Sequence, residues 1–236
     1  MMIEPEKSSV AIVLIGAFNP TIFTPEWFRR VGFINEEEFN SSHIEVTHRD
    51  VSIFKLDWVD INVQQNQFVA TTTASPYVRL SDLVVRTFKE FLSQTPLSML
   101  GINRIVEFSV GNEEVRNRIG HVLAPPAAWG DWHESIASKN KSGRGGMRQL
   151  RMQENTDENR DFGYLLADVQ PSATIGTNII MSMNDHYQFN QEKTGKGEEK
   201  NLKGNPLINV LESNFENSLN KSEWVIDQVM RLKHAV

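Results

Sequence analysis

The sequence predicts an α+β fold, with a largely antiparallel sheet and helices packed on one of its faces. Runs of alternating or β-branched apolar residues recur along the chain, which is the pattern of strands. Polar turns at 64–66, 157–159 and 171–172 separate neighbouring runs, as in a meander. Two longer segments, 81–93 and 206–233, instead carry apolar residues at i, i+3 and i+4, the spacing of an amphipathic helix.

The first part of the chain is predicted to begin with a strand and a short helix. Residues 8–18 form a β-branched and aliphatic run that predicts a buried strand. A short helix follows, with Thr24 as N-cap and Gly32 placed to end it. Residues 43–73 then alternate as strands, and the parity of their apolar positions switches near 56–59, which indicates a bulge or a strand covered on both faces.

The remaining elements repeat the order strand, short helix, strands, long helix. Ser81 is predicted to cap the first long helix, and Gly120 to end a short helix that begins at Asn112. The last helix starts at the cap Asn205, and a fresh cap at 220–223 would divide it into two pieces. Further strands are predicted at 101–110, 147–155, 162–170 and 175–184.

The two short helices share a sequence pattern. Aligned on Gly32 and Gly120, both read cap, x, Glu, apolar, x, x, Arg, apolar, Gly, x, apolar. The match predicts two similar halves, 1–96 and 97–236, within one compact domain that has a shared core. A capped helix that ends at glycine is common, so chance similarity is the alternative to an ancestral duplication.

Composition limits the classes of function. The 236 residues carry a net charge of −6 and no cysteine. The lack of cysteine excludes disulfides, thiol nucleophiles and thiolate metal sites, and the acidic balance disfavours broad binding to nucleic acid. No apolar run is long enough for a membrane span, and the first residues lack a basic segment and a cleavage site. We therefore expect a cytoplasmic protein that does not bind membranes.

Residues 124–135 are the first candidate site. Trp129 and Trp132 lie on either side of Asp131, and His133 follows. An Asp131–His133 pair beside indole rings would orient an imidazole as a general base, or the indoles would hold a partner between them. No Ser or Thr nucleophile in a strained turn stands nearby to complete a triad, and a loop that closes the core is the structural alternative.

A second candidate is the pair Asp185 and His186, which follows the predicted strand 175–184. Polar groups from several elements converge at strand ends, so these two residues with Asp131 and His133 are the candidate catalytic groups of a small hydrolase-like enzyme. The six histidines are dispersed and no HExxH motif is present. We therefore predict no metal site and no cofactor.

The basic segment 139–151 is the third candidate. Its glycine-rich SGRGG loop would hold a phosphate if it opened onto a helix, but it leads into a strand, and no P-loop or GxGxxG motif is present. An acidic partner or nucleic acid is the functional alternative to a flexible hairpin tip. The basic residues of this segment are Lys139, Lys141, Arg144, Arg148 and Arg151.

The pattern SDLVVRTFKEFL…TPLSMLGINRIVEF within 81–110, with NDHY at 184–187, resembles a loosely defined group of uncharacterised bacterial proteins of about this length. The resemblance covers most of the chain, and its motifs are patterns of apolar helix and strand residues. It implies a bacterial cytosolic setting and supplies no activity, cofactor or functional residue.

Together these observations favour a non-enzymatic protein that binds other protein subunits, as a homodimer or as one member of a larger assembly. The residues expected to contact a partner are Trp129, Trp132 and the five basic residues of 139–151. A hydrolase-like enzyme that uses Asp131, His133, Asp185 and His186 is one alternative. A nucleic-acid-binding protein that uses the 139–151 segment is the other.

Overall fold

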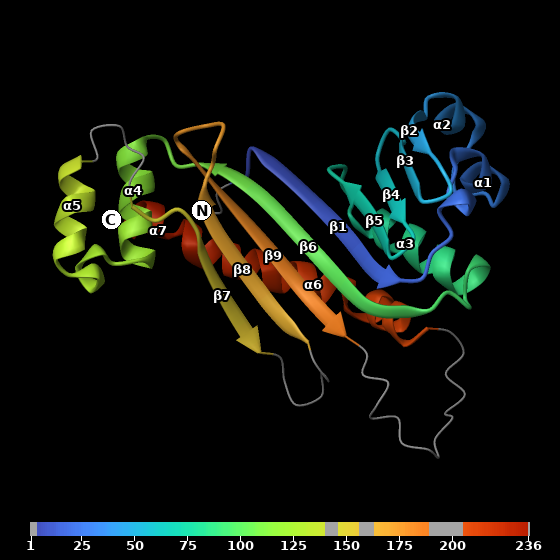
Figure 1. The fold of residues 1–236 in the computed structure, drawn as a ribbon. Helices are drawn as coiled ribbons and strands as arrows, with labels where there is room; N and C mark the ends of the chain where they lie inside the picture. Colours follow the sequence, from blue (N-terminus) through green and yellow to red (C-terminus); the bar gives the residue numbers. More distant parts are fainter. Residues whose placement is uncertain (1–3, 140–145, 156–162, 189–204, 236) are drawn as a thin grey trace, which may run out of the picture.

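The structure is a computed structural model, and it describes residues 4–139, 146–155, 163–188 and 205–235. Its strands form one antiparallel sheet with the order β2-β3-β4-β5-β1-β6-β9-β8-β7 (Figure 1). The predicted α+β class with an antiparallel sheet is therefore confirmed. The strands are β1 (Lys7–Gly16), β2 (His43–Thr47), β3 (Val51–Lys55), β4 (Asp60–Gln64), β5 (Gln67–Thr72), β6 (Leu97–Ser109), β7 (Leu150–Asn155), β8 (Tyr164–Pro171) and β9 (Asn178–Gln188).

Helices connect and cover these strands, and the longest of them, α6, crosses behind the sheet in Figure 1. It runs without interruption from Pro206 to Met230, so the predicted break at 220–223 is absent. The helices are η1 (Pro20–Ile22), α1 (Pro25–Arg30), α2 (Glu36–Asn40), α3 (Val78–Arg86), η2 (Thr87–Phe91), α4 (Glu113–Leu123), η3 (Pro126–Trp129), α5 (Asp131–Lys139), α6 (Pro206–Met230) and α7 (Leu232–Ala235).

The strands β1 and β6 pair at the centre of the sheet and join the two parts of the chain. On one side, β2 to β5 form a meander whose last strand returns beside β1. On the other side, β7 to β9 form a second meander whose last strand returns beside β6. The two parts thus share one sheet and a similar order of elements, whereas a duplication stays a prediction.

The short helices differ in how they end. Thr24 caps α1 as predicted, because its side chain accepts a hydrogen bond from the backbone of Trp27, and Gly32 takes a positive φ of 76° just after the helix. Gly120 does not end α4, which continues to Leu123. The helix stops at Ala124 instead, because the residue before a proline is disfavoured in the helical conformation. The two glycines therefore have different roles.

The first long helix also begins earlier than predicted. It starts at Val78, and Ser81 lies buried inside it rather than at its N-cap. The apparent switch of parity near 56–59 is the turn between β3 and β4, not a bulge. Residues 131–135, for which a loop was the structural alternative, belong to α5.

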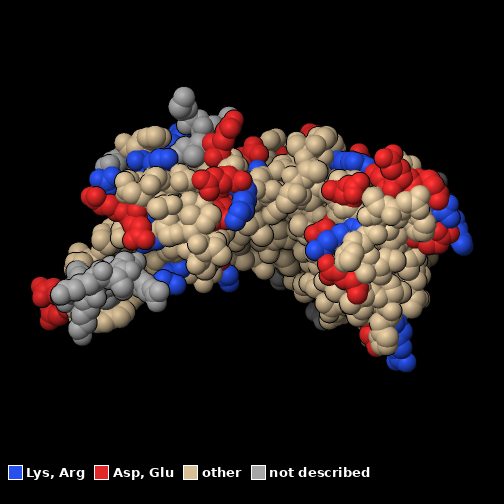
Figure 2. Space-filling view, turned by 90° about the horizontal axis from the view of Figure 1, so that it is seen from above, with Lys and Arg blue, Asp and Glu red and all other residues tan. Residues whose placement is uncertain are grey.

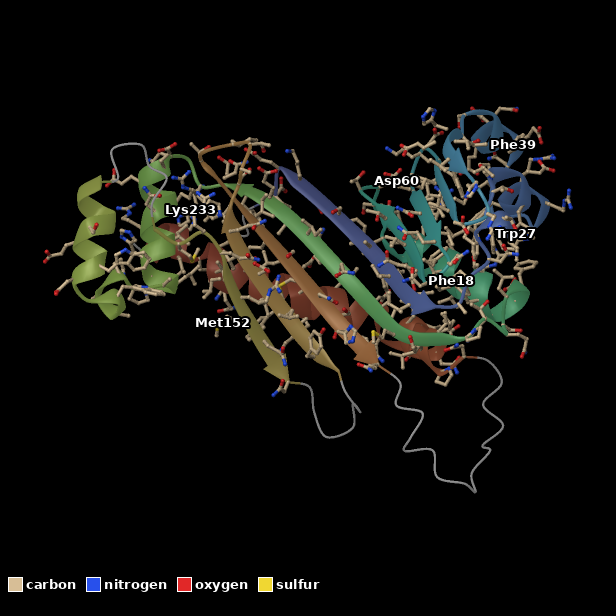
Figure 3. All side chains as sticks on the ribbon, in the orientation of Figure 1. Phe18, Trp27, Phe39, Asp60, Met152 and Lys233 are labelled. Carbon is tan, nitrogen blue, oxygen red and sulfur yellow. The ribbon has the colours of Figure 1, made fainter. Side chains whose placement is uncertain are left out.

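The core lies on one face of the sheet and consists of two apolar clusters. The first packs η1, α1, α3 and the start of α6 against β1 and β3–β5, and its aromatic centre includes Phe23, Phe68 and Phe88, with ring centroids 5.2–6.2 Å apart. Phe18 and Trp27 belong to the part of the molecule that holds this first cluster (Figure 3). The second cluster packs Ile119 of α4 and Ile226 of α6 against β6, β8 and β9. Helix α6 therefore bridges both clusters.

Candidate interaction surface

The segment between α4 and α5 is shaped by prolines and a glycine. Pro125 follows the end of α4, and Pro126 begins the single turn η3. Gly130 then adopts a positive φ of 55°, which is strained for residues that have a Cβ, and α5 begins at Asp131. The result is a tight corner at the end of the molecule beyond the sheet (Figure 1).

Trp129 and Trp132 form an exposed aromatic pair on this corner. Their ring centroids are 5.6 Å apart with an interplanar angle of 69°, an edge-to-face contact. Trp129 is 58% exposed and Trp132 is 59% exposed, whereas Trp27 packs against the first core cluster. The two indoles therefore do not close the core, which was the structural alternative for this segment.

The residues next to the pair in the chain include two carboxylates and a histidine. Val122 on α4, seven positions before Trp129 in the chain, is 48% exposed. Asp131 and Glu134 are exposed in the first turn of α5, where the positive end of the helix dipole stabilises carboxylates. His133 is half-buried, and its backbone N–H donates to the carbonyl of Gly130 at 3.1 Å. The surface is thus an aromatic pair bordered by negative charge.

Asp185 and His186 lie within β9 and point to opposite faces of the sheet, because successive side chains of a strand alternate. Asp185 is buried on the helix side and accepts a hydrogen bond from the Tyr187 hydroxyl at 2.9 Å. His186 stacks on Tyr164 of β8, with centroids 4.6 Å apart. The two cannot act together on one substrate, and Asp131 and His133 belong to α5 at the end of the molecule.

The environment of His186 favours a neutral imidazole. Burial lowers the pKa of His186, because it penalises the charged imidazolium, and the neighbouring charge of Asp185 offsets this only in part. Sequence reasoning missed the partner Tyr164, since the pairing of β8 with β9 brings the two rings together from residues 22 positions apart in the chain.

The sheet face opposite the helices, here called the open face, is not covered by any helix of the two core clusters. One cross-strand row on it runs Val13, Gly101, His186 and Tyr164. On the central strands β1, β5, β6 and β9, no Asp, Glu, Lys or Arg points to the open face. The residues that do so are the odd ones of 9–15, 67–71 and 99–105 and the even ones of 180–188. The molecular outline is indented between its two ends, on the side of this face (Figure 2).

Charged residues at the borders of the open face are paired within the chain. Arg151 on β7 contacts Asp168 on β8 at 2.6 Å, so its guanidinium is already engaged. Lys7 contacts Glu107 at 3.0 Å at the end of β1 and β6. Glu107 has a lowered pKa, chiefly because the Ser172 side chain donates a hydrogen bond to it and also because of Lys7.

The other basic residues of 139–151 gather into no common site in the described part of the chain. Arg148 is exposed, Lys141 and Arg144 lie outside the described residues, and so does the side chain of Lys139. On the face shown in Figure 2, Lys and Arg side chains are interspersed with Asp and Glu.

Within the described ranges, no group of three or more His, Asp or Glu residues is arranged to hold a metal ion. None of the helices in those ranges combines the length and the apolar character needed to cross a membrane. No known protein family matches the chain, and no curated protein is similar to it.

Proposed function

We propose that the chain is a non-enzymatic interaction protein that forms homodimers through the surface of Trp129 and Trp132. The main support for this proposal is that two adjacent indoles are each more than half exposed on a folded corner. Large aromatic side chains dominate binding hot spots, and contiguous exposed apolar groups mark interaction sites on proteins. Self-association removes four indoles from water in one event.

The size of the surface favours a weak dimer. A tryptophan buries about 150–250 Å² in full, so the exposed 58% of Trp129 corresponds to about 90–145 Å². Four such indoles supply about 360–580 Å², less than the roughly 1,200–2,000 Å² of a standard stable interface. Other exposed residues at this corner must supply the rest. We therefore expect weak association, with a dissociation constant on the order of micromolar or higher.

A second copy fits the tryptophan surface better than the open face of the sheet. In a two-fold dimer the same patch lies on both partners, so it must be complementary to itself. An apolar, projecting aromatic pair meets this condition. Two indented faces placed against each other would leave space between them, so the open face is less suited to self-association.

The acidic border of the surface predicts how salt acts. A two-fold contact brings the carboxylates of Asp131 and Glu134 near those of the second copy, and like charges repel. Added salt screens this repulsion, so the dimer should tighten as the salt concentration rises. Association driven by opposite charges would weaken instead.

Sedimentation velocity over a range of concentrations tests the proposal. The wild-type chain is expected to shift from monomer to dimer near micromolar concentration, and the double variant Trp129→Ala/Trp132→Ala to remain monomeric. Trp224→Ala is the matched control, because Trp224 is also exposed (56%) but lies on α6. A wild-type chain that stays monomeric at every concentration, or a Trp224 variant that is equally impaired, would overturn the proposal.

The variant Asp131→Asn provides a second test by sedimentation velocity. It removes the repelling charge between the indoles without shortening the side chain, so the dimer should tighten, most clearly at low salt. Weaker association of this variant at low salt would mean that Asp131 attracts its partner, which contradicts a contact between two identical acidic surfaces.

A further inference from the structure

The sheet ends at β7, which lies at its margin in Figure 1. β7 pairs with β8 along one side, and within the described ranges no strand pairs with its other side. The backbone N–H and C=O groups of alternate residues point away from β8 and have no partner in the sheet. Such a row of donors and acceptors matches another extended segment, because their spacing is that of a strand.

β7 lacks the features that usually block pairing at a sheet edge. Its residues follow β8 in one register without a shift, and the exposed part of the edge contains no proline. The opposite edge, β2, is interrupted by a register shift. Both charged side chains of β7 are engaged within the chain, since Arg151 contacts Asp168 at 2.6 Å and Glu154 contacts Lys221 at 3.1 Å. Their partners lie on β8 and α6, so neither charge blocks the edge.

The helix side of β7 carries exposed apolar surface. Met152 pairs with Ala167, which packs against the second core cluster, so Met152 points to the helix side. Leu150 and Glu154 share this side, because side chains of a strand alternate. Met152 is 62% exposed, the largest exposure among the large apolar residues of the described ranges, and lies at the outer margin of the sheet in Figure 3.

Helix α6 places an indole beside this edge. The ammonium of Lys221, which contacts Glu154, lies 4.9 Å from the centre of the Trp224 ring. Lys221 therefore connects β7 to Trp224, which is also exposed. Met152 and Trp224 together border the space that the helix-side residues of an added strand would enter.

A second copy of β7 fits this edge poorly. Opposite residues of an antiparallel pair share one face, so a symmetric pair is centred on a single residue. Centring on Met152 places Glu154 opposite Leu150, and a carboxylate then faces an apolar side chain. Centring on Gln153 places Glu154 opposite Met152, with the same mismatch. Centring on Arg151 sets two like charges against each other.

We propose that β7 accepts an extended segment of another protein as an added antiparallel strand. The segment carries apolar side chains opposite Leu150 and Met152, and a lysine or arginine opposite Glu154. Main-chain hydrogen bonds supply the affinity, and the alternate side chains supply the specificity. This edge is separate from the surface of Trp129 and Trp132, so the two proposals stand or fall independently.

Titration calorimetry of the full chain with a capped synthetic peptide tests the edge. From its N-terminus the peptide has one lysine and two isoleucines at alternate positions, with threonines between and around them. Two isomers carry N-methyl groups, one on the threonines and the other on the lysine and isoleucines. One isomer should lose binding and the other keep it, because only alternate residues of an added strand donate hydrogen bonds to the edge. Equal binding of the two isomers would overturn the proposal.

Variants of the chain locate the site. Met152→Ala should weaken peptide binding about two- to fivefold, the range for one cross-strand pair. Ile44→Ala is the matched control, because Ile44 is 53% exposed on the opposite edge, and Trp129→Ala/Trp132→Ala should also bind as the wild-type chain does. No binding of the unmethylated peptide at millimolar concentration, or an equal loss in the Ile44 variant, would contradict the proposal. So would dimers of the double tryptophan variant that Met152→Ala dissociates, because a second copy would then occupy the edge.

Discussion

Replacing Ser222 by alanine is expected to stabilise the protein. Ser218 and Ser222 lie one turn apart on α6, are 3% and 1% exposed, and have hydroxyls without a partner among the described residues. They face the sheet where α6 passes from the first core cluster to the second. A buried hydroxyl without a hydrogen bond costs about 1 kcal/mol or more, and serine is about 0.5 kcal/mol worse than alanine within a helix.

The sum predicts a gain of about 1.5 kcal/mol for Ser222→Ala. For a chain of this size each kcal/mol raises the melting temperature by about 2–4 °C, so an increase of about 3–6 °C is expected in calorimetry or circular dichroism. Ser213→Ala on the same helix is the control, because the exposed Ser213 hydroxyl donates to the carbonyl of Asn209 at 2.9 Å. It should change the melting temperature little. A lower melting temperature for Ser222→Ala would refute the reasoning, since the hydroxyl would then be bonded in the folded protein.

Three further changes test other parts of the account. Gly16→Ala should destabilise the protein by about 2 kcal/mol or more, measured by urea unfolding, because its Cβ would lie 2.2 Å from the carbonyl oxygen of Pro96; an unchanged midpoint would contradict this. Glu107→Gln should be less stable than the wild-type chain near neutral pH. Because the folded pKa of Glu107 is lowered, that difference should vanish as the pH falls through this folded pKa, as followed by melting temperature. His186→Gln should become more stable relative to the wild-type chain as the pH falls below about 6.5, the ordinary pKa of histidine. The reason is that the lowered pKa of His186 in the folded state makes its protonation there unfavourable. Parallel pH profiles of the two melting temperatures would contradict this.

The sequence correctly predicted the elements that depend on residues close to one another in the chain. The cap at Thr24, the glycine after α1 and the meander β2–β5 are confirmed, because capping and alternation are local properties. The start of α3 and the end of α4 were predicted wrongly. Both depended on a single residue, Ser81 or Gly120, that packs inside the folded helix instead of marking its end.

The candidate site was predictable only in its residue types. The sequence indicates that Trp129 and Trp132 stand close together, but it gives no measure of their exposure. Trp27 also lies in a short, proline-started helix and yet packs into the aromatic core. In the same way, Asp185 and His186 are neighbours in the sequence, and only the orientation of β9 shows that they point to opposite faces.

The most direct test of the central claim measures the distance between position 131 in two copies of the chain. Because the chain has no cysteine, Asp131→Cys introduces a single site for a nitroxide label, and pulsed electron resonance reads the distance between labels. A dimer through the tryptophan surface predicts a strong, short-range dipolar signal that Trp129→Ala abolishes. The absence of this signal at concentrations where the chain sediments as a dimer, or its persistence in the Trp129→Ala background, would contradict the account.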